Sequence, residues 1–151
     1  MSLWTDEAAY RIAVGTLNLS TDVLKLMLVN ASHTPLKTDI FVSGIVSSEI
    51  AATGYVGGFA GAGRQAAPRT ITKDVTANKA RVIFNADAAF GAIGGAINDT
   101  VAGAWLIKES TSDSASLLVA FLGLASPIPT NGSTFTLTRD AINGNLTLSV
   151  I

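Results

Sequence analysis

The sequence predicts a mainly β protein, an antiparallel β-sandwich of which a jelly roll is one form, with a short helix near the N-terminus. Three observations lead to this fold class. Two apolar runs flank a polar joint in residues 101–124, residues 22–30 place three leucines on one side of an extended segment, and the pair Asn143-Gly144 is typical of a tight hairpin turn. Turns are many and helical patterns are few, which also favours a sandwich.

Residues 101–124 are expected to form a hairpin at the centre of the sandwich. The two apolar runs, residues 104–107 and 117–122, do not alternate with polar residues, and a strand that is apolar on both sides has to be covered on both sides. The joint between them, residues 108–116, is polar and is expected to be an exposed tip. In the second run we expect one side with Leu117, Val119 and Phe121 and another with Leu118, Ala120 and Leu122.

The N-terminal part predicts a helix followed by a strand. Thr5 is a suitable cap, two acids follow it in the first turn, and Gly15 provides a stop, so we expect the helix in residues 5–16. The apolar positions with helical spacing are Ala8, Ala9, Ile12 and Ala13. The next segment, residues 22–30, predicts the first strand with its leucine side towards the core.

The middle of the chain is less regular. Residues 46–52 predict one helical turn, and a loop with five glycines follows in residues 54–64. Residues 69–76 and 79–86 predict two strands joined at Ala77-Asn78, and in the second Val82 and Phe84 alternate with Arg81, Ile83 and Asn85. Residues 88–97 are expected to form a second loop, rich in glycine and alanine.

The C-terminal segment predicts a hairpin around Asn143-Gly144. A two-residue turn there pairs Ile142 with Asn145 and Arg139 with Leu148. Opposed residues of an antiparallel pair share a side. One side then collects Phe135, Leu137, Ala141, Leu146, Leu148 and Val150.

Composition limits the classes of function. The length suits one domain, expected over residues 1–151 with an arm and helix in residues 1–16. Only 14% of the residues are charged and the net charge is −1, which argues against nucleic acid as a main partner. We expect no secretory signal, because acids stand where a basic start is needed, and no membrane span, because prolines interrupt the long uncharged stretch in residues 114–138.

The sequence shows no catalytic or cofactor motif. Residues 58–63 fit a phosphate-binding spacing, but Arg64-Gln65 stand where Lys and Ser or Thr are needed, so we expect a flexible or closely packed backbone loop. The chain has no cysteine and one histidine, His33, which excludes thiolate and two-histidine metal sites. No paired serine or carboxylate motif is evident for His33, which is expected to be a surface turn residue. The carboxylates are scattered; Asp87, Asp99 and Asp113 are expected to bond local backbone, while a weak calcium site in a loop stays open. We therefore expect no enzyme, no cofactor and no metal.

Aromatic residues on the arm and the glycine loop are the candidates for contact with a partner. Trp4, Tyr55 and Phe59 either anchor a partner surface or fold back over the ends of the sandwich, and the sequence leaves both open. With Met1, Leu3 and Arg64 they form the predicted partner-binding set.

Six short motifs occur in order along nearly the whole chain. They are DVLKLMLV at residues 22–29, Thr34-Pro35, GYVGG at residues 54–58, FNAD at residues 84–87, AWLIKE at residues 104–109 and NGSTFTL at residues 131–137. In this order the chain resembles a family of small virion structural proteins of tailed bacteriophages.

The resemblance implies a non-enzymatic role. Several such proteins look like head decoration (cement) proteins, which bind outside an assembled shell of major capsid protein, and others serve in the tail or at the head–tail junction. The expected partners are then the major capsid protein and further copies of this chain, as a dimer or trimer, with neither nucleic acid nor membrane. The expected location is the capsid exterior, after synthesis in the host cytoplasm. The alternative is a carbohydrate- or receptor-binding module whose loop aromatics stack on sugars.

Overall fold

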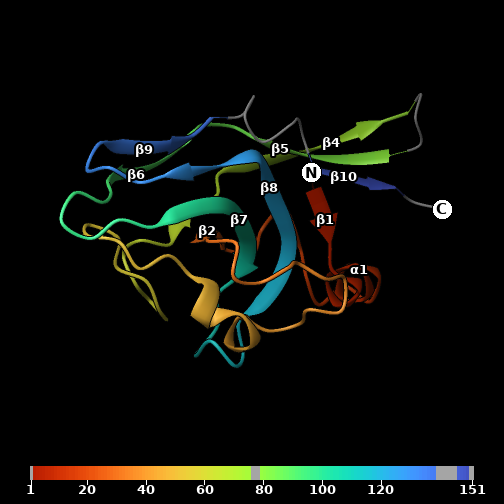
Figure 1. The fold of residues 1–151 in the computed structure, drawn as a ribbon. Helices are drawn as coiled ribbons and strands as arrows, with labels where there is room; N and C mark the ends of the chain where they lie inside the picture. The colour runs from red at the N-terminus through yellow and green to blue at the C-terminus, as the bar shows by residue number, and fades with distance from the viewer. Residues whose placement is uncertain (1, 76–78, 139–145, 150–151) are drawn as a thin grey trace.

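The computed structural model describes residues 2–75, 79–138 and 146–149 and shows two layers of antiparallel strands (Figure 1). One layer is a five-stranded sheet with the spatial order β1 (Ser2–Trp4), β8 (Leu117–Pro129), β7 (Thr100–Lys108), β2 (Leu24–Val29) and β3 (Gln65–Ala66). The other layer has a three-stranded sheet, β10 (Leu146–Ser149), β5 (Lys79–Phe84) and β4 (Arg69–Asp74), and a two-stranded sheet, β6 (Ala88–Ala92) and β9 (Thr134–Leu137).

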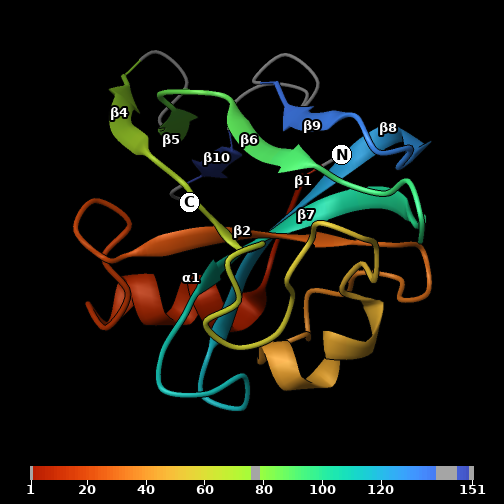
Figure 2. The same cartoon turned by 90° about the vertical axis from the view of Figure 1, so that its left-hand side faces the viewer.

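The second layer lies over one face of the five-stranded sheet, as the two views in Figures 1 and 2 show. This arrangement and the helix α1 (Asp6–Ala13) confirm the predicted antiparallel β-sandwich with a short N-terminal helix. A jelly roll needs eight strands in two Greek keys. The described strands instead form sets of five, three and two, and the consecutive strands β4–β5 and β7–β8 pair with each other.

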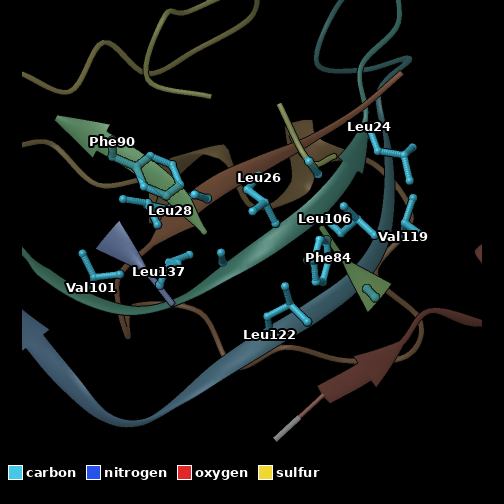
Figure 3. Close-up of a cluster of buried hydrophobic side chains, with 14 of the residues drawn as sticks. Leu24, Leu26, Leu28, Phe84, Phe90, Val101, Leu106, Val119, Leu122 and Leu137 are labelled. Atoms are coloured by element: carbon cyan, nitrogen blue, oxygen red, sulfur yellow. The ribbon is translucent and has the colours of Figure 1, made fainter. Parts of the chain in front are cut away.

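The main core lies between the two layers (Figure 3). The leucines of β2 point into it, as predicted, and meet side chains from the β7–β8 hairpin and from the second layer. Its members include Leu24, Leu26, Leu28, Leu106, Val119, Leu122, Phe84, Phe90 and Leu137. Each such side chain, once buried, stabilises the fold by about 1.5–3 kcal/mol relative to exposure.

A smaller core covers the opposite face of the five-stranded sheet. It collects Met27, Val29, Val42, Ile45, Trp105, Ile107 and Leu118, with Phe121 packed against them. The covering side chains are Val42 and Ile45: Val42 begins the 3₁₀ turn η1 (Val42–Gly44), and Ile45 lies between η1 and a second turn, η2 (Val46–Ser48). The prediction that the central hairpin is covered on both sides is therefore confirmed.

The expected sides of the second apolar run are confirmed for residues 117–119 and wrong from Ala120 onward. Leu106 pairs with Ala120 but Ile107 pairs with Leu118, so Val119 is an extra residue in β8. Val119 and Ala120 consequently both face the main core, and Phe121 turns to the smaller one. A β-bulge shifts the alternation by one residue in this way.

The N-terminal helix begins where the sequence predicts. The hydroxyl of Thr5 accepts a hydrogen bond from the backbone N–H of Ala8 (3.1 Å), and Gly15 ends the segment with φ +76°. Of the expected apolar face, Ala8 is buried and Ile12 packs against the core, whereas Ala9 and Ala13 are exposed.

One predicted segment of the second layer turned out differently. Residues 88–97 are not wholly a loop, because Ala88 and Phe90 are buried and β6 pairs with β9. Phe135 and Leu137 of β9 are buried between exposed threonines, as the alternation predicts. The turn at Asn143-Gly144 lies outside the described residues, and so does at least one member of each cross-strand pair predicted for it.

No helix in the described part of the chain is long and apolar enough to span a bilayer.

Candidate functional site

The glycine-rich loop closes on itself. The backbone N–H of Gly63 donates to the carbonyl of Val56 (2.9 Å), and that of Gly61 donates to Gly58 (2.9 Å). A Cβ atom at Gly61 would lie 2.3 Å from the carbonyl oxygen of Val56, and one at Gly63 would lie 2.8 Å from the ring of Tyr55. Of the two alternatives for this loop, the structure therefore favours the closely packed backbone.

The side chain of Arg64 lies beneath this loop and is fully buried. A guanidinium has five N–H donors, and here it makes five hydrogen bonds to three carboxylates. The bonds to Glu49 measure 3.0 and 2.8 Å, those to Asp113 measure 2.6 and 3.2 Å, and the one to Glu109 measures 3.3 Å. We call Arg64, these three carboxylates, Lys25 and Tyr55 the Arg64 cluster.

The carboxylates also hold the backbone of the loop. Glu49 accepts hydrogen bonds from the hydroxyl of Tyr55 (3.0 Å) and from the N–H of Gly58 (2.9 Å). Glu109 accepts one from the N–H of Ala60 (3.3 Å) and a second from the ammonium of Lys25. The cluster therefore fixes the loop at two points of its backbone.

Strand ends place these side chains together. Glu49 forms a β-bridge with Val29 at the end of β2, and Arg64 directly precedes β3, which pairs with Lys25 and Leu26. Glu109 directly follows β7. Asp113 comes from the joint between β7 and β8, so the joint is not wholly the exposed tip that the sequence predicted.

Three further hydrogen bonds show why the joint between β7 and β8 is not simply an exposed tip. Ser116 is fully buried, and its hydroxyl accepts from the N–H of Ser110 (3.0 Å) and donates to the carbonyl of Ser112 (2.7 Å). The N–H of Ser43 donates to the carbonyl of Asp113 (3.1 Å). The joint is thus bound to the turn η1, which covers the smaller core, although residues 114 and 115 are exposed.

The pKa shifts of Arg64 and Glu109 favour their charged forms, and that of Tyr55 favours its neutral form. Burial lowers the pKa of Arg64, but hydrogen bonds to Glu49 and Asp113 outweigh it, so the pKa lies well above the ordinary value for arginine. Burial raises the pKa of Glu109, and the hydrogen bond from Lys25 outweighs that effect and lowers it below the ordinary value. Burial and the neighbouring Glu49 raise the pKa of Tyr55, which keeps the phenol protonated.

The Arg64 cluster has a structural role: it holds separate segments of the chain together. All five donors of Arg64 are used by carboxylates, so the guanidinium has none left for a phosphate or a carboxylate ligand. In the described part of the chain, no three His, Cys, Asp or Glu side chains are arranged to hold a metal ion.

The residues of the predicted partner-binding set occupy different environments. Tyr55 and Arg64 are buried, so they act inside the molecule and not on its surface. Phe59 is 44% exposed, and its neighbour Val56, which the sequence analysis did not single out, is 61% exposed. Met1 lies outside the described residues.

The two other members of that set lie on the edge strand β1. Leu3 pairs with Phe121 and Trp4 with Ala120. Both side chains are half-buried, and Trp4 packs against the main core. For Trp4 the structure therefore favours the alternative in which the aromatic side chain folds back onto the sandwich.

Three other polar predictions need correction. His33 does have a carboxylate partner, because its Nε2 lies 2.8 Å from an oxygen of Asp39. Asp99 binds distant groups as well as its neighbour Thr100: it accepts from the N–H of Ala51 (3.0 Å) and from the amide of Asn30 (3.2 Å). Asp113 belongs to the Arg64 cluster. All three carboxylates hold loops in place.

Two shallow depressions lie away from the cluster. One, of about 320 Å³, lies between α1, the segment after it and β4, with Ile12, Leu17, Leu19 and Ile71 among its lining side chains. The other, of about 260 Å³, is lined by Asp6, Glu7, Lys37, Thr38 and Ile40.

No protein-family model, no curated protein and no solved structure matches this chain.

Proposed function

We propose that this chain is a non-enzymatic structural component of a tailed-bacteriophage virion, a decoration (cement) protein that binds the outside of the major capsid protein shell. It acts as a symmetric dimer or trimer, so that many copies of a modest contact stabilise the shell together. The ordered motifs that resemble the phage family, over nearly the whole chain, support this proposal.

One structural observation carries the proposal furthest. Twelve large apolar side chains are more than about a third exposed in the described residues, in a chain with only 14% charged residues. Four of them, Leu36, Ile40, Phe41 and Val46, fall within eleven residues of the segment that covers the smaller core. An apolar, charge-poor surface on a rigid scaffold suits permanent burial between protein subunits.

The test is the composition and resistance of the virion. We expect mass spectrometry of purified virions to detect the chain in stoichiometric amount. Virions assembled without it should release their DNA at lower temperature and lower salt, and added protein should restore the resistance. Absence from the virion, or unchanged resistance of particles that lack it, contradicts the proposal.

Two alternatives to the capsid exterior can be tested: a location in the tail or at the head–tail junction, and a carbohydrate as the partner. An antibody label on the tail or at the head–tail junction instead of the head would assign the chain to those structures. A carbohydrate-binding module is favoured by the exposed ring of Phe59 on a loop, and binding to a glycan array tests it.

A further inference from the structure

We propose that residues 56–60, the tip of the glycine-rich loop, form a preformed anchor that inserts Phe59 and Val56 into an apolar pocket with basic side chains at its rim. This inference rests on the proposed function, because the pocket is assigned to the shell subunit. Beyond the proposed function, it names the contact residues and proposes that the Arg64 cluster holds them in position.

The tip presents apolar side chains that the fold does not use. Val56 is 61% exposed and Phe59 is 44% exposed, and neither belongs to the main or the smaller core. Aromatic side chains that enter a partner pocket carry a large share of the binding free energy in protein interfaces.

The backbone of the tip is held at two points by side chains of the Arg64 cluster. Gly58 and Ala60 donate their N–H groups to Glu49 and Glu109, and the close approach at Gly61 admits no side chain. A loop fixed before binding loses less conformational entropy on association, so the same contacts give tighter binding.

Ala60 adds an independent observation. It has φ +57°, and among the described residues other than glycine it alone has positive φ. The left-handed conformation costs a residue with a Cβ about 1–2 kcal/mol. Strain of this kind concentrates at sites of binding, and here it follows directly after Phe59 in the chain.

Charge indicates the chemistry of the occupant. Three carboxylates and two cations give the Arg64 cluster a formal charge of −1, and its partly exposed charged side chains are Lys25 (25%), Asp113 (18%) and Glu109 (11%). A net negative charge beside an apolar tip is complementary to a protein pocket bordered by Lys or Arg.

The experiment measures binding to shells purified from virions from which this chain has been stripped. The full chain is co-sedimented with these shells at increasing concentration and at two salt concentrations. We expect Phe59→Ala to weaken binding by roughly 10- to 30-fold, as for an interface anchor. The matched control is Tyr10→Ala on α1, where an aromatic ring is 62% exposed, and we expect it to leave binding unchanged.

A second pair of variants tests the ordering of the tip. Gly61→Ala keeps every side chain of the tip but forces its backbone to move, so we expect weaker binding with unchanged Phe59 and Val56. Ala62→Ser alters an exposed position in the same loop and should bind as the unmodified chain does. If Gly61→Ala does not fold, as judged by circular dichroism, Phe59→Ala still decides, because Phe59 lies outside both cores.

The outcomes separate the two proposals. If the unmodified chain binds and Phe59→Ala binds equally well, the anchor is overturned and the proposed function stands. If the unmodified chain does not bind, both fail. If Phe59→Ala changes only the oligomeric state of the free protein, the occupant is a second copy, and if it abolishes binding to a glycan array, the occupant is a sugar; either result overturns the assignment to the shell subunit.

Discussion

Arg64 joins three parts of the chain, because its guanidinium binds carboxylates from residues 49, 109 and 113. Arg64→Met keeps much of the length of the side chain but leaves these carboxylates facing one another. Removal of one member of a buried ion pair costs about 3–5 kcal/mol, and we expect the free energy of unfolding in urea to fall by that amount. Arg11→Met is the control: its pair with Glu7 is about one-third exposed, so its loss should cost less than about 1 kcal/mol. An equal loss of unfolding free energy in the two variants would contradict this structural role of Arg64.

Ala60 provides a test in the opposite direction. Glycine adopts positive φ without a Cβ penalty, so Ala60→Gly should leave stability unchanged or raise it by up to about 1 kcal/mol. Ala62 is exposed in the same loop and does not have positive φ. Ala62→Gly should lower the free energy of unfolding by about 0.4–1 kcal/mol, because glycine raises the conformational entropy of the unfolded chain. Urea unfolding of both variants checks the opposite signs. A loss of similar size in both would show that Ala60 is not strained.

At the scale of elements, α1 depends on the cap Thr5 more than a surface helix would. Its buried hydroxyl accepts from the N–H of Ala8 and donates to the carbonyl of Leu118 (2.8 Å), so it joins the helix to β8. We expect Thr5→Ala to cost about 2 kcal/mol, the upper end for an N-cap, because two buried groups lose their partner. Thr5→Ser keeps both bonds and should recover most of the loss, again measured by urea unfolding. Equal destabilisation by the two variants would assign the effect to the methyl group.

Elements that follow a strong local pattern could be predicted from the sequence. The cap at Thr5, the leucines of β2 and the two apolar runs of the β7–β8 hairpin each carry their signal within a few residues. The bulge at Val119 could not be predicted, because an extra residue in β8 is fixed by its pairing with β7 and leaves no mark in an all-apolar run. Residues 88–92 were missed as a strand because small residues there give little alternation.

At the scale of the whole molecule, the Arg64 cluster could not be predicted. Arg64 lies 15 residues from Glu49, 45 from Glu109 and 49 from Asp113, so no local spacing relates them. A signal was present in the composition: with 14% charged residues, a charge beside a glycine loop or directly after a buried strand is a candidate for pairing. The fold class can be predicted from local patterns. The conformation of the glycine-rich loop cannot, because it depends on contacts between distant segments.

Acid should weaken the whole molecule, because Asp22, Asp99 and Glu109 have lowered pKa values. Burial raises each pKa, but hydrogen bonds outweigh it: from Lys108 to Asp22, from backbone N–H groups to Asp99 and from Lys25 to Glu109. The folded state therefore binds fewer protons than the unfolded state, whose carboxyl pKa values are about 4. The stability from these groups is full above that pH and is lost as pH falls through the folded-state values. We expect the free energy of unfolding in urea to be level between about pH 7 and 5, to fall below about pH 4, and to fall less steeply in Asp99→Asn, whereas an equally steep fall in that variant would exclude Asp99 as a contributor.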